Sequence, residues 1–182
     1  SSITLSDPLA PNINFTSIDA SCYGGSDGSI DLSISGGNGP FNFLWNTSDT
    51  TEDITNISVG TYTYTITDDN GCVFSDTVSI SQPAPLNAST VTTNVACANG
   101  NNGTAILTIA GGITPYIENW GSSNPLALNA GIHTFIITDD NGCIFTDSIT
   151  ITEPPVLLVN YTTTNTLCNG SSNGTAILNI SG

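Results

Sequence analysis

An internal repeat constrains this chain more than any other feature of its sequence. The string DDNGC at residues 68–72 returns at residues 139–143, a shift of 71 positions. The string NGTAIL at residues 102–107 returns at residues 173–178, again 71 positions later. A fixed period of this size is typical of an array of small domains built on one plan. We therefore expect the same fold to recur along the chain.

Both ends of the chain fall inside repeats. The string SITL at residues 2–5 resembles SITI at residues 148–151, which closes a later copy. The expected organisation is the last strand of a preceding repeat, two complete repeats and the N-terminal part of a third, at residues 1–8, 9–83, 84–154 and 155–182 respectively. We expect these residues to belong to a longer array.

The charge balance excludes several kinds of partner. The chain has no lysine or arginine, and its 15 acidic residues give a formal net charge of −15. It has nothing to neutralise phosphates, so nucleic acid is not an expected partner. A Schiff-base lysine or an arginine clamp is excluded. No stretch reaches the roughly 18 apolar residues of a membrane span, so direct membrane insertion is not expected. The expected partners are neighbouring repeats of the same chain and, in a fibre, other copies.

Five cysteines recur with the repeat. The simplest interpretation pairs Cys22 with Cys72 and Cys97 with Cys143, at spacings of 50 and 46 positions, while Cys168 pairs beyond the last residue. Each bond would contribute about 4 kcal/mol in the chain-entropy model. Disulfides predict an oxidising, extracellular location. Metal ligation is the weaker alternative, because there is no C-x-x-C motif and only one histidine.

Apolar and polar residues alternate throughout, which is the pattern of strands with one buried face. In the first repeat the expected strands are one leading into Cys22, then residues 29–35, 41–45, 54–57, 61–67 and 73–81. The Asp-Asn-Gly turn makes a hairpin of the last two strands. Trp45 and Trp120 recur at one strand position and are expected in the core. The predicted fold class is all-β: tandem immunoglobulin-like antiparallel β-sandwich repeats with one disulfide per repeat.

Several motifs recur in a fixed order. After the first cysteine they are Gly-Gly with Pro-Phe, a tryptophan, Gly-Thr-Tyr, TDDNGC and ISQP, at residues 36–41, 45, 60–62, 67–72 and 80–83. The second copy keeps Gly-Gly, the tryptophan, TDDNGC and ITEP, at residues 111–112, 120, 138–143 and 151–154. This order resembles the SprB-type repeat of very large cell-surface adhesins of gliding Bacteroidota. The resemblance implies type IX secretion, a tandem-array stalk and a role in adhesion or gliding motility. It implies no catalytic residue, so the chain is not expected to be an enzyme.

Two acidic turns are the candidate metal sites. They contain oxygen-bearing side chains of the type that calcium prefers, from Asp68, Asp69, Asn70, Asp139, Asp140 and Asn141. Calcium is therefore the one candidate cofactor. The alternative is a plain hairpin turn in which the side chains bond to the local backbone and Gly71 or Gly142 supplies the positive φ.

Three further side chains are candidate glycosylation sites. Thr50, Thr77 and Ser148 each directly follow an aspartate, a pattern that resembles Bacteroidota O-glycosylation. Separately, His133 replaces the tyrosine of the first copy, Tyr62. A tyrosine near this point of an immunoglobulin-like fold can bond back to the chain as a corner, and a histidine can imitate it.

These observations predict a structural segment, a stalk or filament, of a large secreted cell-surface adhesin. One alternative is an extracellular filament whose subunits also assemble laterally, which would expose apolar residues on one outer face. A second is a set of carbohydrate-binding accessory repeats of a secreted enzyme, which would expose aromatic residues.

Overall fold

The computed structural model describes residues 11–182, which form strands and connecting loops. In this part of the chain no helix is long and apolar enough to cross a membrane. The last strand of a preceding repeat, predicted at residues 1–8, lies outside the described residues. Backbone contacts divide the chain into two compact units. Of the described residues, the first unit holds 11–87, 110–116 and 139–143, and the second unit holds the remainder.

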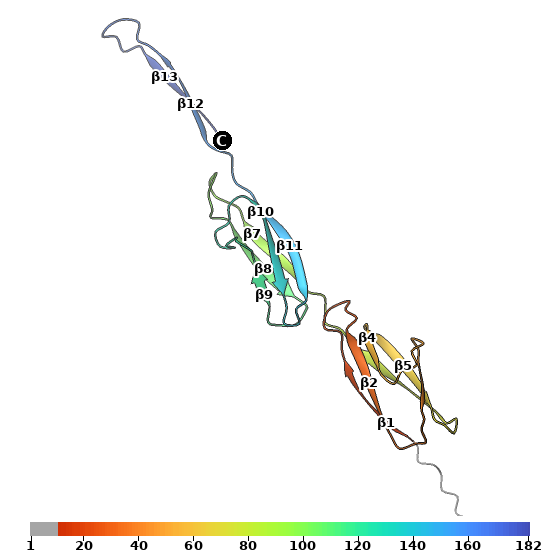
Figure 1. Ribbon diagram of the computed structural model, residues 1–182. Helices are drawn as coiled ribbons and strands as arrows, with labels where there is room; N and C mark the ends of the chain where they lie inside the picture. Colours follow the sequence, from red (N-terminus) through yellow and green to blue (C-terminus); the bar gives the residue numbers. More distant parts are fainter. Residues whose placement is uncertain (1–10) are drawn as a thin grey trace, which may run out of the picture. The chain divides into compact units, whose positions relative to one another are not determined.

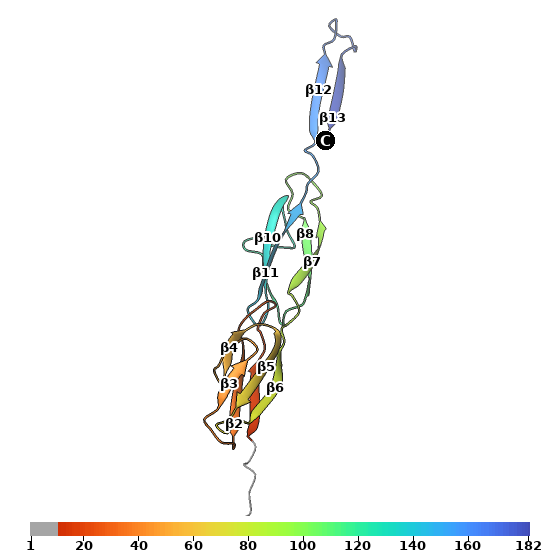
Figure 2. The ribbon, with the colours of Figure 1, turned by 90° about the vertical axis from the view of Figure 1, so that its right-hand side faces the viewer.

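The first unit is built from two three-stranded antiparallel sheets. One has the order β1-β2-β4, with β1 (Asn12–Ile18), β2 (Gly28–Ser35) and β4 (Ile54–Ile57), all visible in Figure 1. The other has the order β3-β5-β6, with β3 (Asn42–Trp45), β5 (Gly60–Thr67) and β6 (Val73–Ile80), labelled in Figure 2. The alternation in the sequence predicted these strands, and the β-sandwich fold is confirmed.

Side chains from both sheets meet in one core in the first unit. Trp45 packs edge-on against Tyr64 with ring centroids 5.4 Å apart, and both side chains are fully buried. The other members of this core alternate along their strands and are Ile30, Leu32, Ile54, Ile57, Tyr62, Ile66, Val78 and Ile80. The prediction that Trp45 packs in the core is therefore confirmed. Burial of such side chains contributes roughly 1.5–3 kcal/mol each, which is the main force holding the sheets together.

The second unit repeats this plan. Its strands are β7 (Asn87–Thr93), whose first residue belongs to the first unit, β8 (Thr104–Ala110), whose last residue does too, β9 (Ile117–Asn119), β10 (Gly131–Thr138) and β11 (Ile144–Ile151). They form the sheets β7-β8 and β11-β10-β9. Trp120 packs on Phe135 with ring centroids 5.0 Å apart, and both are buried. A separate hairpin of β12 (Leu158–Thr164) and β13 (Thr175–Ser181) follows.

In the first repeat the two segments that contain cysteines lie at opposite ends of the sandwich. In the β5–β6 ladder Thr67 lies opposite Val73, so the turn with Cys72 closes one end of the sandwich. At the other end Ala20 donates a backbone hydrogen bond of 3.0 Å to Ser81, which places the segment before Cys22 there. The eight residues of β6 rise by about 26 Å between these two ends.

His133 makes the same corner contact in the second repeat that Tyr62 makes in the first. Tyr62 donates its hydroxyl to the carbonyl of Ser58, four residues upstream, at 2.8 Å. His133 reaches the carbonyl of Asn129, also four residues upstream, at 2.9 Å from Nε2. A carbonyl oxygen only accepts, so Nε2 carries the hydrogen, and Nδ1 lies 3.1 Å from the hydroxyl of Ser123. The predicted imitation of the corner is confirmed.

Candidate functional site

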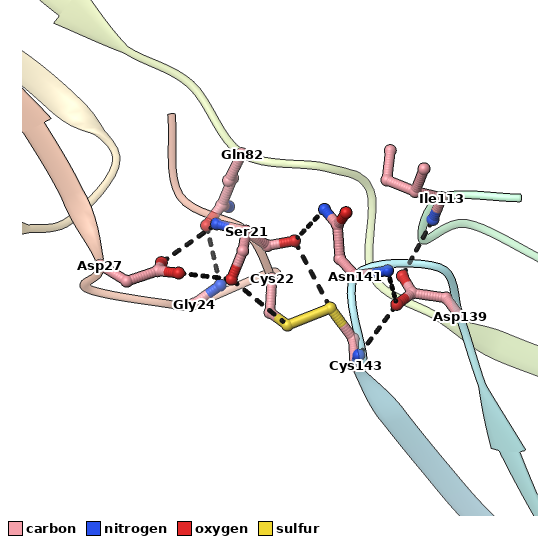
Figure 3. The surroundings of a disulfide bond; sticks show 9 residues. All are labelled: Ser21, Cys22, Gly24, Asp27, Gln82, Ile113, Asp139, Asn141 and Cys143. Carbon is pink, nitrogen blue, oxygen red and sulfur yellow. Dashed lines mark hydrogen bonds between the residues drawn. A yellow bond between two sulfur atoms is a disulfide. The ribbon is translucent and has the colours of Figure 1, made fainter. Parts of the chain in front are cut away.

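A disulfide bond joins two consecutive repeats of the chain. Cys22 and Cys143 are bonded across a sequence separation of 121, with their Cα atoms 5.7 Å apart. Both residues belong to the first unit, which includes the turn at residues 139–143. Figure 3 shows the bond between two loops, one from each repeat, with polar side chains on both sides of it. We call Cys22, Cys97 and Cys168 loop cysteines, and Cys72 and Cys143 hairpin cysteines.

The loop that presents Cys22 is held by its own hydrogen bonds. The carboxylate of Asp27 accepts the N–H of Ser21 at 3.0 Å and also the Ser21 hydroxyl. Gly24 adopts φ 73°, which favours glycine, and donates its N–H to the side chain of Gln82 at 2.8 Å. Gly25 donates to the carbonyl of Cys22 at 2.9 Å. These bonds fix the backbone on both sides of the cysteine.

Hydrogen bonds lower the pKa values of two exposed carboxylates in the first repeat. The Ser21 hydroxyl and then its N–H hold the pKa of Asp27 below its usual value, because both donors favour the charged form. The hydroxyl and then the N–H of Ser81 lower the pKa of Asp19 in the same way. Both groups are therefore charged acceptors that tie the cysteine loop together at neutral pH.

A buried aspartate shapes the turn that presents Cys143. Asp139 Oδ1 accepts the N–H groups of Asn141 at 3.0 Å and of Cys143 at 2.8 Å. Its Oδ2 accepts the N–H of Ile113 at 2.9 Å, so one carboxylate organises three backbone donors. Gly142 completes the turn with φ 82°. The result is a compact tip with its cysteine at the start of β11.

Further contacts connect the two sides of the bond. Asn141 donates its side-chain amide to the carbonyl of Ser21 at 2.8 Å. The sulfur of Cys143 lies 3.4 Å from the same carbonyl, a packing contact since a disulfide sulfur has no hydrogen to donate. Gly112 donates to the carbonyl of Ala84 at 2.8 Å, which ties the loop after β8 to the connection between repeats. The disulfide therefore lies within a set of polar contacts that align its two sulfurs.

Two segments of the chain match a known protein family. The SprB repeat family matches residues 14–50 and residues 89–117. These two segments are similar to the SprB repeat. Each matched segment contains a loop cysteine, Cys22 in the first and Cys97 in the second. No curated protein matches the chain. The SprB repeat is a structural repeat, not an enzymatic one, and the family suggests a repeat segment of a cell-surface adhesin.

The predicted pairing of cysteines within each SprB-type repeat is wrong. Cys22 bonds to Cys143 and not to Cys72, and Cys97 is not bonded to Cys143. The reason is geometric: the loop cysteine and the hairpin cysteine of one repeat lie at opposite ends of an eight-residue strand, about 26 Å long. A disulfide requires Cα atoms about 4.4–6.8 Å apart. Instead of one disulfide in each repeat, one bond joins two repeats.

Three cysteines are free in the described part of the chain. Cys72, Cys97 and Cys168 are all exposed and unbonded among residues 11–182. Pairing of Cys168 with a cysteine beyond the last residue stays a prediction.

The acidic turns are shaped by local hydrogen bonds. Asp68 Oδ1 accepts the N–H of Asn70 at 3.0 Å and of Cys72 at 2.8 Å, the same bonds that Asp139 makes in the second repeat. Asp69 and Asp140 are exposed on the turns. Among the described residues no three histidine, cysteine or acidic side chains cluster as a metal site. The hairpin interpretation accounts for the contacts of Asp68 Oδ1 and Asp139 Oδ1, whereas Asp139 Oδ2 accepts the N–H of Ile113 in the loop after β8. Calcium binding stays a prediction.

The glycosylation candidates are accessible. Thr50, Thr77 and Ser148 are all exposed. Thr77 and Ser148 donate their N–H groups to the side chains of the preceding aspartates, at 2.7 Å in each case. Modification of these hydroxyls stays a prediction.

Sequence reasoning missed the residues that support the disulfide. Ser21, Asp27, Gln82 and Ile113 make the contacts described above, yet none stood out by residue type. A signal was available in the recurrence of a short polar side chain five residues after each loop cysteine, at Asp27, Asn102 and Asn173.

Proposed function

We propose that this chain is a load-bearing stalk segment of a secreted cell-surface adhesin, serving adhesion or gliding motility after export by type IX secretion. The observation that carries the proposal is the bond between Cys22 and Cys143, which joins consecutive SprB-type repeats. A disulfide is typical of proteins outside the cytoplasm, in agreement with a cell-surface location. A stalk has to transmit force without lengthening, and a covalent link from one repeat to the next serves that task.

The force path explains why the position of the bond matters. When the ends of the chain are pulled, tension crosses from Cys22 to Cys143 through the disulfide. The residues between them form a closed loop and carry no tension once the bond is taut. Most of two sandwiches therefore remains outside the force path. By contrast, a bond within each repeat would leave the connection between repeats as the sole link.

Composition adds a second supporting argument. The chain has no lysine or arginine, so trypsin-like proteases find no cleavage site in it. Its formal charge of −15 also favours solubility and keeps neighbouring stalks apart through repulsion. Both properties suit a segment that is permanently exposed outside the cell.

Single-molecule stretching of the whole chain, held at its two ends, tests the proposal. Unfolding in oxidising buffer should end at a final length about 400 Å shorter than unfolding in reducing buffer, because 121 residue steps at about 3.3–3.6 Å each stay enclosed by the bond. The variant Cys72→Ser is the matched control, since that cysteine is exposed and unbonded, and it should behave as the unaltered chain does. Equal final lengths in both buffers would reject the load-bearing role.

A further inference from the structure

The three loop cysteines occur in the same local structure, and one of them is bonded. At the bonded Cys22 the side chain five residues later accepts an N–H from the residue before the cysteine, at 3.0 Å. At Cys97 the side chain of Asn102 accepts from Ala96 at 3.0 Å, and at Cys168 the side chain of Asn173 accepts from Leu167 at 3.1 Å. The residue two after each cysteine has positive φ, and its values are 73° at Gly24, 60° at Asn99 and 77° at Gly170.

The two hairpin cysteines also match, and again one of them is bonded. Cys72 and Cys143 each donate their N–H at 2.8 Å to an aspartate four residues earlier. Each accepts an N–H from that aspartate at 3.0 Å in return. The glycines before them have φ values of 81° and 82°. Free Cys72 therefore presents the same tip as bonded Cys143.

We propose that every loop cysteine of this protein pairs with the hairpin cysteine of the repeat that follows it. Cys97 and Cys168 are then each one half of a covalent junction, and a further copy of the repeat supplies the other half. Cys72 is the complementary half, for the loop cysteine of a repeat that precedes it. The bond between Cys22 and Cys143 is the independent observation that carries this rule, because it joins one cysteine of each class across adjacent repeats. No cysteine of the chain violates the rule.

The fold also excludes the alternative pairing within one repeat. Cys97 cannot reach Cys143 in its own repeat, since the eight residues of β11 separate the two ends of the sandwich. Val95 donates its N–H to Thr152 at 3.0 Å, and Asn99 donates to the side chain of Glu153 at 2.6 Å. These bonds hold the Cys97 loop at the far end of β11, as the bond of Gly24 to Gln82 does at Cys22.

Formation of each new bond needs an oxidant. A small-molecule disulfide such as oxidised glutathione can supply the oxidising equivalents. One cysteine thiolate attacks the glutathione disulfide and releases one glutathione as a thiolate. The second cysteine thiolate then attacks the mixed disulfide, forms the protein bond and releases the second glutathione. Two protein thiols lose two electrons and two protons, and one glutathione disulfide is reduced to two thiols.

The consequence for a stalk is an interleaved set of closed loops. Cys97 lies inside the loop closed by Cys22 and Cys143, so the next loop begins before the previous one ends. A load that crosses to Cys143 follows the backbone to Cys168 and crosses again. Of the 24 residues on that path, eight in β11 and seven in β12 are already extended.

Interleaving therefore limits extension. The 25 steps from Cys143 to Cys168 reach at most about 85 Å, whereas the 146 steps from Cys22 to Cys168 would reach about 500 Å if they unfolded without bonds. Such an array is nearly inextensible until its disulfides are reduced. This mechanical consequence rests on the proposed stalk function, whereas the pairing rule does not.

The pairing rule is tested by extending the whole chain. Gly182 corresponds to Gly111, so a copy of residues 112–154 placed after Gly182 completes a third repeat with its own hairpin cysteine. After equilibration with oxidised and reduced glutathione, digestion without reduction and mass spectrometry should find Cys97 linked to the appended cysteine. Cys72 and Cys168 should remain free thiols, which alkylation before digestion will mark. A link between Cys168 and the appended cysteine would overturn the rule.

A second variant needs no added segment. In Cys22→Ser, Cys143 has lost its partner, and pairing within the repeat would now join it to Cys97. The rule expects all four remaining cysteines to stay free of intramolecular bonds in the same glutathione buffer. An intramolecular bond between Cys97 and Cys143 would overturn the rule, whatever the extended chain does. Correct pairing together with free extension under load would reject the stalk function and leave the rule intact.

Discussion

The side-chain amide of Asn141 donates a hydrogen bond of 2.8 Å to the carbonyl oxygen of Ser21, beside the disulfide that joins their two repeats. This bond holds the tip of one repeat against the loop of the other while the two sulfurs are joined. A net hydrogen bond contributes about 1 kcal/mol, which corresponds to roughly a fivefold change in an equilibrium constant. Asn141→Ala should therefore lower the equilibrium constant for forming the Cys22–Cys143 bond from glutathione about fivefold, as measured by the oxidised fraction across a series of glutathione ratios.

Asn70→Ala is the matched control for this prediction. Asn70 occupies the same position of the turn in the first repeat, but no hydrogen bond of its side chain is found in the described part of the chain, and Cys72 is unbonded there. The control should leave the oxidised fraction of the Cys22–Cys143 pair unchanged. If both variants shift the equilibrium equally, Asn141 does not align the sulfurs.

Acid should weaken the first repeat more than the second. Asp27 has a folded pKa below its usual value of 3.8, so it contributes stability at pH values above the unfolded pKa. That contribution is lost as the pH falls below about 4 and through the folded pKa. Asn102 makes the equivalent bond in the second repeat with an amide, which does not titrate in this range. In Asp27→Asn the free energy of unfolding of the first repeat should therefore fall less steeply as the pH is lowered; we call this fall the acid limb.

Tryptophan fluorescence can separate the two repeats in this test. Each repeat has one buried tryptophan, so Trp120→Phe leaves Trp45 as the reporter of the first repeat, and Trp45→Phe does the reverse. The reciprocal change Asn102→Asp should introduce an acid limb into the second repeat. An acid limb that persists in Asp27→Asn would assign it to other carboxylates, of which Asp19 is the first to examine because its pKa is also lowered.

Local patterns predicted the strands well, and non-local pairing explains the main failure. The alternation around Leu32 or Tyr64 is a property of neighbouring residues, because successive side chains of a strand face opposite sides. Which cysteine reaches Cys22 depends instead on which end of β6 lies beside its loop. That is decided by the bonds of Ala20 to Ser81 and of Gly24 to Gln82, residues about 60 positions apart. The similar spacings of 50 and 46 positions in the two copies could not reveal it.

The histidine corner should tolerate a return to tyrosine and not a loss of polarity. His133→Tyr restores the residue type that bonds to Ser58 in the first repeat, so a hydroxyl should reach the carbonyl of Asn129. His133→Phe leaves that carbonyl without its partner and should destabilise the second repeat by about 1 kcal/mol or more. Chemical unfolding followed by Trp120 fluorescence compares the two. Equal stability of both variants would show that packing, and not the hydrogen bond, fixes this position.

Two glycines with positive φ should differ sharply in their tolerance of alanine. At Gly111, φ is 74° and an added Cβ would lie 2.0 Å from the carbonyl oxygen of Pro85, so both the conformation and the contact oppose a side chain. At Gly142, φ is 82° but a Cβ would meet nothing within 4 Å. Gly142→Ala should therefore cost only the conformational penalty, about 1–2 kcal/mol.

Gly111→Ala should cost clearly more, because the backbone of the connection between repeats must shift to accept the methyl group. The bond from Gly112 to Ala84 should weaken with it, since that bond lies next to the clash. Urea unfolding measures the stability of both variants, and hydrogen exchange of the Gly112 amide locates the change. Similar losses in the two variants, with no faster exchange at Gly112, would show that the connection accommodates the methyl group without losing its contact to the loop after β8.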